Sequence, residues 1–422
     1  MWWHVYPLGF TGAPIRETEA EHPEPHRLTR IEAWLDHVVE LGLNGIALGP
    51  IFASTTHGYD TTDHLSIDPR LGDEDDLRSL VAAAHDRGVR VLLDGVFNHV
   101  GREHPAFLSA LESGEGAALF RLGADGKPEV FEGHDALVEL DHSSDAVVDL
   151  VVEVMDHWLR LGVDGWRLDA AYSVPTAFWA RVLPAVRERH PQAWFLGEVI
   201  HGDYAQIVAE STMDSVTQYE LWQGIWHALA DANLFELQHA IVRDDELLAA
   251  FVPYTFVGNH DVTRIASAVG PDLAPHALAV LMTVAGTPAI YAGDELGMQA
   301  VKEERIGGDD AVRPEMPPVP PTADELDGPA AHMLHVTRTL VAIRRRHPWL
   351  TRAHTDVVDV ANGTIVLRTA TADAAIVTLL NITGEAVTLP AADATEVLAG
   401  DDVHLADAHA TLPPRGWAVL GG

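Results

Sequence analysis

Charged side chains interrupt short apolar runs at several places in this chain, and their types could support acid–base or nucleophilic chemistry. Residues 162–171 read GVDGWRLDAA, so Arg167 and Asp169 stand two positions apart in a segment that otherwise has the composition of a buried strand. Side chains at positions i and i+2 of a strand project from the same face. The arginine and the carboxylate are therefore expected to lie side by side, in a setting where ionised groups are costly unless paired.

Two further carboxylates follow apolar runs in the same way. Glu198 stands near the end of WFLGEV at 194–199, and Asp261 directly follows TFVGNH at 255–260. Any one of these acids alone is more simply interpreted as half of a structural ion pair. Three acids at three strand ends, each beside another polar residue, favour a catalytic site instead. The polar residues found near the ends of the same and neighbouring runs are Tyr59, Asp94, Asn98, His99, Asn259 and His260.

The elements that must position these residues follow a regular alternation. Short apolar runs alternate with helical patterns at 30–42, 73–88, 144–162 and 175–190, which predicts a parallel sheet covered by helices. Eight such runs predict an α/β fold of the (β/α)8 TIM-barrel type, whose active site lies at the C-terminal ends of the strands. The runs are 2–6, 45–48, 89–96, 164–170, 194–199, 214–219, 255–260 and 288–293.

The spacing of the runs also predicts three domains. The third and fourth runs are about twice as far apart as usual, so residues 101–140 are expected to be a short inserted subdomain. From about Thr351 the apolar period changes to two, which is typical of antiparallel strands. We therefore predict a catalytic barrel from 1–100 and 141–347, and a C-terminal β-sandwich domain from 348–422.

Composition narrows the classes of partner. Lys and Arg total 27 and Asp and Glu total 63, which gives a formal net charge of −36 and disfavours nucleic acid and anionic membranes as partners. Most of this charge is expected to serve solubility. The chain has no cysteine, its first ten residues lack the features of a signal peptide, and no apolar run approaches a membrane span. These features favour a cytoplasmic protein.

Four motifs carry a resemblance to a known family. DGVFNH at 94–99, GWRLDA at 165–170, GEV at 197–199 and VGNHD at 257–261 resemble the four signature regions of the alpha-amylase family of glycoside hydrolases. HGYDTTDH at 57–64 and GDELGM at 293–298 resemble two further family segments. The resemblance spans nearly the whole chain. It implies a catalytic barrel, a subdomain inserted after the third strand and a C-terminal β-domain.

The resemblance also implies catalytic roles for the three acids. Asp169 matches the nucleophile that forms a covalent glycosyl-enzyme, Glu198 matches the general acid and base, and Asp261 matches a third carboxylate that binds sugar hydroxyls. Arg167 is expected to keep Asp169 ionised, because a neighbouring opposite charge lowers the pKa of a carboxylate. A retaining mechanism follows from this pairing.

Further residues are predicted to bind substrate. The resemblance places the ring of Tyr59 against a sugar, His99 and His260 on sugar hydroxyls, Asp94 beside Arg167, and Arg313 near the rim of the pocket. Trp222 and Trp226 stand four positions apart on a predicted helix. That spacing fits core packing, and it also fits a stacking platform for a second sugar.

Two departures from the family pattern indicate which members of the family the chain resembles most. Calcium-dependent endo-amylases follow the nucleophile motif with Lys-His, where this chain has Tyr172 and Ser173. Thr56 replaces an aspartate that single-glucose-trimming members carry before the GYD motif. The chain is therefore closer to oligosaccharide-active, neopullulanase-like members. No cofactor is expected to be required, and Asn98 matches a family calcium ligand without a clear set of partners.

The predicted function is hydrolysis of α-glucosidic bonds in short α-glucans by a retaining α-glycosidase, with a small neutral oligosaccharide as partner and no nucleic acid or membrane. The alternative is a transglycosylase or a trehalose-synthase-like isomerase on the same site, because both pass through the same glycosyl-enzyme. A non-catalytic binding protein is disfavoured because all three acids are present. The sequence leaves the linkage preference and the oligomeric state open.

Overall fold

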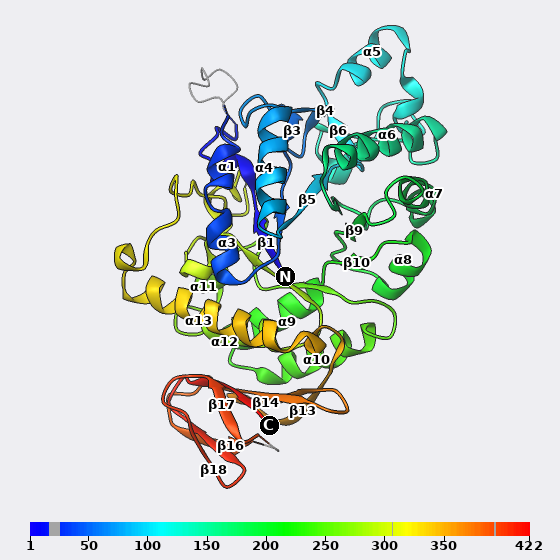
Figure 1. The fold of residues 1–422 in the computed structure, drawn as a ribbon. Coiled ribbons are helices and arrows are strands. Elements are labelled where there is room, and N and C mark those ends of the chain that lie inside the picture. The colour runs from blue at the N-terminus through cyan, green and yellow to red at the C-terminus, as the bar shows by residue number, and fades with distance from the viewer. Residues whose placement is uncertain (17–25, 306, 392–393) are drawn as a thin grey trace.

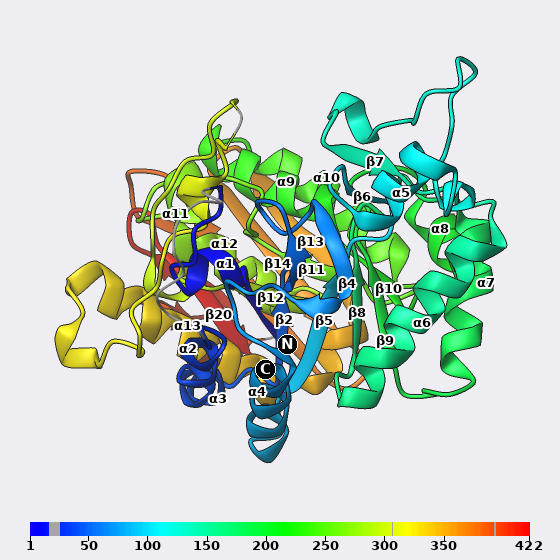
Figure 2. The same cartoon turned by 90° about the horizontal axis from the view of Figure 1, so that it is seen from above.

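The computed structural model describes residues 1–16, 26–305, 307–391 and 394–422, and within these residues eight parallel strands form a barrel (Figures 1 and 2). The hydrogen-bonded order is β10-β9-β8-β5-β2-β1-β12-β11, and a parallel bridge between Thr217 and Tyr254 joins its two ends. The TIM-barrel prediction is confirmed. The strands are β1 (Trp2–Val5), β2 (Gly45–Leu48), β5 (Arg90–Gly95), β8 (Gly165–Leu168), β9 (Trp194–Gly197), β10 (Ser215–Val216), β11 (Tyr254–Phe256) and β12 (Thr287–Tyr291).

Apolar side chains fill the barrel near the start of the strands. Trp2 and Trp194, at the first positions of β1 and β9, stack with ring centroids 5.6 Å apart. They share an interior cluster with Leu92, Leu196 and Phe256. An apolar filling at the N-terminal ends leaves the C-terminal ends of the strands to hold polar groups, which is where the predicted site residues fall.

Helices surround the barrel and bury their apolar faces against it (Figure 2). The helix predicted at 30–42 is instead two helices, which meet at Trp34, whose buried indole N–H donates to the oxygen of Pro317 at 3.0 Å. The main helices are α2 (Thr29–Glu32), α3 (Leu35–Leu41), α4 (Glu74–Asp86), α6 (Asp145–Leu161), α7 (Thr176–Arg187), α8 (Tyr204–Ser211), α9 (Tyr219–Ala230), α10 (Leu234–Leu247), α12 (Ala274–Thr283) and α13 (Gly328–Arg346).

Two small excursions rise from the C-terminal ends of the strands. The hairpin of β3 (Phe52–Ser54) and β4 (Thr61–Ile67) follows β2. Between β5 and β8 the chain forms β6 (His99–Gly101), α5 (Pro105–Ser113) and β7 (Leu137–Glu139), with β6 and β7 paired antiparallel. This insertion stands at one end of the molecule in Figure 1, beyond α6.

The C-terminal region lies on the opposite side of the molecule from the insertion, next to α10 and α12 (Figure 1). Its described part forms an antiparallel five-stranded sheet, β13-β14-β15-β20-β17, and a three-stranded sheet, β16-β19-β18. Thr378 donates a hydrogen bond to Thr283 at 2.8 Å across the contact with α12. The strands are β13 (His354–Ala361), β14 (Thr364–Ala370), β15 (Ala375–Asn381), β16 (Val387–Pro390), β17 (Glu396–Ala399), β18 (His404–Ala406), β19 (His409–Leu412) and β20 (Trp417–Gly421).

None of the helices in the described part of the chain is both long enough and apolar enough to cross a bilayer.

Candidate active site

One buried guanidinium gathers three carboxylates at the C-terminal end of the barrel. Arg167 donates from Nη1 to Asp94 at 2.8 and 2.9 Å and to Asp169 at 2.7 Å, and its Nη2 lies 2.6 Å from Oε1 of Glu198. The register of the parallel strands brings these side chains together. Asp94 on β5 is in register with Arg167 on β8, and β9 leads into Glu198. All four residues are buried.

The turn that follows β8 brings the nucleophile candidate and the acid candidate together. Ala170 has a φ of +45°, which is uncommon for a residue with a side chain. In this conformation its N–H donates to Oε2 of Glu198 at 3.0 Å, while the N–H of Asp169 donates to the oxygen of Gly95 at 3.0 Å. The strained turn thus fixes Asp169 and Glu198 relative to each other.

Burial, more than charge pairing, sets the protonation of this cluster. It raises the pKa of Asp94 to about 6 and the pKa of Asp169 well above its usual value, and Arg167 opposes both shifts. Arg167 lowers the pKa of Asp169, as its charge predicts, but burial outweighs this effect. Arg167 carries one positive charge and contacts three carboxylates, so it cannot neutralise all of them.

A second polar group surrounds Asp261. Arg313 donates from Nη2 to Asp261 at 2.6 Å and from Nε to the oxygen of His260 at 2.9 Å. Nε2 of His260 lies 3.0 Å from the other carboxylate oxygen of Asp261 and also contacts the hydroxyl of Tyr59. The rings of His260 and Tyr59 are parallel, with centroids 5.5 Å apart. Asp261 keeps about a third of its side chain exposed, so it can reach a ligand.

Tyr59 links the cluster around Arg167 to the residues around Asp261, and His99 contacts the main chain of Tyr59. The hydroxyl of Tyr59 donates to Asp94 at 3.1 Å. His99 lies 3.0 Å through Nε2 from the main-chain oxygen of Tyr59, and Asn98 lies 3.1 Å from its Nδ1. Burial lowers the pKa of His99 to about 3, so the ring is neutral. Both ring nitrogens of His99 are engaged within the protein, and its ring stacks on Phe131 with centroids 4.8 Å apart.

The three acids open into one cavity of about 540 Å³. Of the predicted set, Asp169, Glu198, Asp261, Tyr59 and His99 line this cavity. The remaining predicted residues lie directly behind it, where they contact the lining residues: Asp94, Arg167, His260 and Arg313.

Calcium near Asn98 stays a prediction. Asn98 is buried, its amide group faces His99, and its main-chain oxygen accepts from the N–H of Leu140. In the described ranges, the one group of acidic and histidine side chains with metal-ligand spacing is His26, Asp73 and Asp76, at the exposed start of α4. There Asp73 and Asp76 form a capping box, which accounts for their closeness without a metal.

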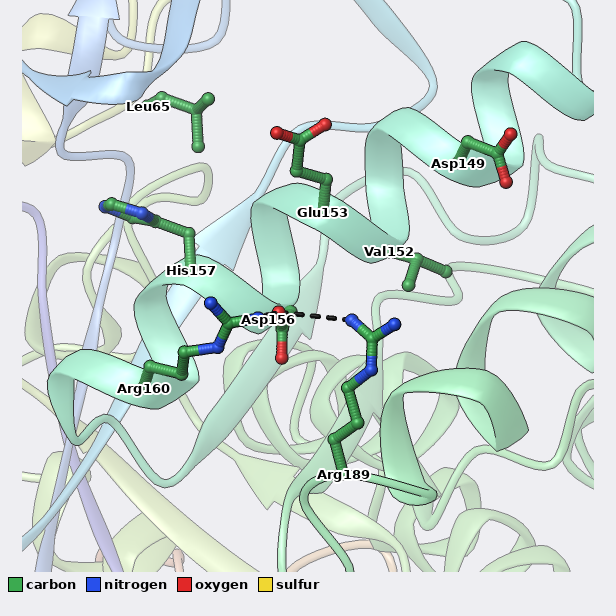
Figure 3. Close-up of a pocket in the computed structure, with 8 residues that line it drawn as sticks. All are labelled: Leu65, Asp149, Val152, Glu153, Asp156, His157, Arg160 and Arg189. Atoms are coloured by element: carbon green, nitrogen blue, oxygen red, sulfur yellow. Dashed lines mark hydrogen bonds and ion pairs between the residues drawn. The ribbon is translucent and has the colours of Figure 1, made fainter.

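Another hollow, of about 360 Å³, lies outside the barrel (Figure 3). Its central residue is Asp156 of α6, whose carboxylate pairs with Arg160, with Arg189 at 3.2 Å and with His190 at 2.9 Å. The pairs with Arg189 and His190 join α6 to the residues that follow α7 (Thr176–Arg187). The hollow is therefore part of the helix packing and stands apart from the three acids.

Sequence reasoning missed two residues of the site. Tyr219, at the start of α9, donates its hydroxyl to Glu198 at 3.2 Å and accepts from Asn259 at 2.9 Å. His4 of β1 has its Nε2 atom 3.1 Å from Nδ1 of His260. His4 interrupts the apolar run WWHVY just as Arg167 interrupts GVDGWRLDAA, so the same signal was available in the sequence.

Comparisons with known sequences agree with this geometry. Residues 23–122 and 130–319 match the family model described as "Alpha amylase, catalytic domain", and the chain therefore belongs to the alpha-amylase family. A cyclomaltodextrinase from Bacillus sp. is 35% identical over 284 residues, which are 63% of this chain and 51% of that protein. Neopullulanase 2 from Thermoactinomyces vulgaris is 34% identical over 287 residues, 63% of this chain and 48% of that protein. The chain thus spans about half the length of these relatives.

Solved structures extend the likeness to the whole chain. The ligand-free cyclic alpha-maltosyl-(1→6)-maltose hydrolase from Arthrobacter globiformis has a TM-score of 0.82 and 25% identity, covering 100% of this chain and 98% of that one. A structure named cyclomaltodextrinase has a TM-score of 0.82 and 25% identity, covering 100% of this chain and 78% of that one. The arrangement of barrel, insertion and C-terminal sheets is therefore shared with these hydrolases.

Proposed function

We propose that this protein is a retaining α-glycosidase that hydrolyses α-glucosidic bonds in short α-glucans. The observation that carries the proposal is the arrangement of Asp169 and Glu198, which share Arg167 and open with Asp261 into one cavity. Relatives named cyclomaltodextrinase and neopullulanase support a substrate of this class.

In the proposed first step a carboxylate oxygen of Asp169 attacks the anomeric carbon and forms a bond to it. The glycosidic bond between that carbon and the leaving oxygen breaks. Glu198 donates its proton to that leaving oxygen. This step requires a proton on Glu198 and an ionised Asp169. Arg167 holds both acids and stabilises the ionised one.

In the second step water replaces Asp169 at the anomeric carbon. Glu198, now ionised, accepts a proton from that water, and the bond to Asp169 breaks. Tyr219 and the N–H of Ala170 each bond one oxygen of Glu198, so they orient the acid through both steps. If a sugar hydroxyl takes the place of water, the same step is transglycosylation or isomerisation, the alternative function.

Asp261 is proposed to bind hydroxyls of the reacting sugar. Arg313 and His260 fix its carboxylate, while its exposed part faces the cavity. Contacts that strengthen as the sugar ring flattens lower the barrier, because they bind the transition state more tightly than the substrate. Tyr59, with its ring lining the same cavity, is placed to contact the apolar face of that sugar.

We also propose that the protein works inside the cell on oligosaccharides. Relatives from Bacillus subtilis named intracellular maltogenic amylase are 30% identical over 280 residues, and the absence of cysteine fits a reducing compartment.

A product profile tests the proposal. The protein is incubated with maltotriose, panose, isomaltose, trehalose, sucrose, cyclodextrin and soluble starch, and the products are separated by chromatography. We expect glucose or maltose from the short substrates, with activity abolished in Asp169→Ala and retained in Asp149→Ala, an exposed acid on α6. Full activity of Asp169→Ala on every substrate contradicts the proposal. New disaccharides or longer chains favour the transferase alternative.

A further inference from the structure

A second hollow, of about 370 Å³, adjoins the cavity that holds the three acids. The two share Trp222, Asp261, Val262 and Lys302 as lining residues, so they lie side by side. Nothing in the two proposed catalytic steps uses this second hollow. Its volume falls in the range of ligand pockets in proteins.

Two tryptophans form the apolar wall of the hollow. Trp222 and Trp226 lie on successive turns of α9, with ring centroids 5.8 Å apart and ring planes inclined by 45°. Both rings are only partly buried, unlike their neighbours Leu221 and Ile225. Phe256 lies behind Trp222, nearly parallel to it at 6.3 Å. The sequence left core packing and a stacking platform open, and the partial exposure of both rings to one hollow favours the platform.

The rest of the lining suits a sugar. Ile265 and Ala268 of α11 (Ile265–Ala268) extend the apolar surface, while Thr263, Lys302 and Glu304 supply polar groups. A glucosyl unit has apolar ring faces and a rim of hydroxyls. An aromatic wall with a few polar groups at its edge matches both parts.

The position of the hollow relative to Glu198 indicates on which side of the cleaved glycosidic bond the hollow lies. Tyr219 bonds to Glu198, and the ring of Trp222 packs edge-on against Tyr219 with centroids 5.7 Å apart. Trp226 follows one turn later on the same helix. The wall therefore runs outward from Glu198, the group that protonates the leaving oxygen.

We infer that the Trp222–Trp226 hollow binds glucosyl units on the leaving-group side of the cleaved bond, and that it is also the site from which an acceptor sugar enters. This inference rests on the proposed function. In the transfer step, an acceptor hydroxyl forms the new bond to the anomeric carbon, its proton passes to Glu198, and the ester bond to Asp169 breaks.

The test compares long and short substrates. We expect Trp226→Ala to raise KM for maltopentaose relative to α-glucosyl fluoride, whose one-atom leaving group cannot reach the hollow, by about five- to tenfold, since a lost ring contact of this kind is worth roughly one factor of ten in affinity. The share of transfer products at high maltotriose is expected to fall in parallel. Ala268→Phe, which fills the hollow without removing its wall, should act in the same direction. Phe235→Ala, which removes an exposed aromatic ring on α10, is the matched control and should change neither value.

The outcomes separate the inference from the function it rests on. If the wild-type protein cleaves neither substrate, the proposed function fails. If it cleaves both, and folded Trp226→Ala and Ala268→Phe keep the wild-type ratio of KM values and the wild-type share of transfer products, the inference is overturned. Circular dichroism and thermal unfolding establish that each variant is folded, and the filling variant keeps the test decisive if Trp226→Ala does not fold.

Discussion

At the scale of single residues, the site depends on buried groups that act through one another. Arg167 contacts three acids, Arg313 fixes Asp261, and His4 contacts His260. The contact between the imidazoles of His4 and His260 determines which nitrogen of His260 carries a proton. If Nε2 of His260 carries the proton that faces Asp261, then Nδ1 of His260 accepts and His4 donates. We regard His4 as a positioning residue that sets the tautomer of His260.

The first prediction tests this role for His4. His4→Leu cannot donate to His260, so we expect kcat/KM on maltotriose to fall about tenfold, the size of one lost hydrogen bond of about 1.4 kcal/mol. His4→Gln keeps an N–H donor and is expected to recover most of the loss. Steady-state kinetics of the two variants, with thermal unfolding as a check on folding, provides the measurement. Equal kinetics for the Leu and Gln variants count against a tautomer role.

The second prediction concerns pH and Asp94. Because burial raises its pKa from 3.8 in the unfolded chain to about 6, the folded protein holds this proton more tightly. Its contribution to stability is present below about pH 4 and is lost as the pH rises through 6. Asp94→Asn removes this titration. The free energy of unfolding of the variant minus that of the wild type should therefore increase between pH 4 and pH 7, measured by urea unfolding. A flat or falling difference contradicts the raised pKa.

At the scale of elements, most of the barrel could be predicted because strands buried on both faces are continuous apolar runs. The hairpin of β3 and β4 and the pair of β6 and β7 could not, since strands of three residues such as β3 show no usable period. The helix predicted at 30–42 is split next to Trp34, whose indole N–H bonds to Pro317, far along the chain. Residues such as Tyr219 escape prediction for the same reason, because their partners are distant in sequence.

The third prediction tests the turn after β8. Ala170 is buried and has a positive φ, which a β-branched residue adopts only with strain. We expect Ala170→Val to lower the free energy of unfolding by about 1–3 kcal/mol and to lower kcat, because the turn also supplies the N–H that bonds Glu198. Ala170→Gly tolerates this φ and serves as the control. Denaturant unfolding and kinetics of both variants give the answer, and a Val variant as stable and active as the Gly variant argues against a strained turn.

At the scale of the whole molecule, most of the acids behind the net charge of −36 lie outside the site. The acids of the site contact Arg167 and Arg313, whereas many of the remaining acids are exposed and repel one another through solvent. The C-terminal sheets contact α10 and α12, on the side of the molecule away from the insertion, and the residues lining the cavity belong to the barrel and the insertion.

The fourth prediction follows from the location of most acids outside the site. Raising NaCl from about 0.01 to 0.3 M shortens the Debye length from about 30 Å to below 10 Å and should raise the Tm, since surface repulsion is screened. The kcat/KM for neutral maltotriose is expected to change by less than about twofold, because an uncharged substrate is not steered by the field. Thermal scans and kinetics across the salt series test both parts. A Tm that falls with salt contradicts the claim that repulsion between surface acids governs how salt changes the stability.

The central claim is that Asp169 forms a covalent bond to the sugar while Glu198 handles the proton. α-Glucosyl fluoride needs little help from an acid to leave, but breakdown of the intermediate needs Glu198 as base. We therefore expect Glu198→Gln mixed with this substrate to accumulate a species heavier by one glucosyl unit in intact mass spectrometry. Peptide mapping should place that unit on Asp169. Label on another residue, or a glucosyl adduct that persists in the double variant Asp169→Ala, Glu198→Gln, contradicts the account.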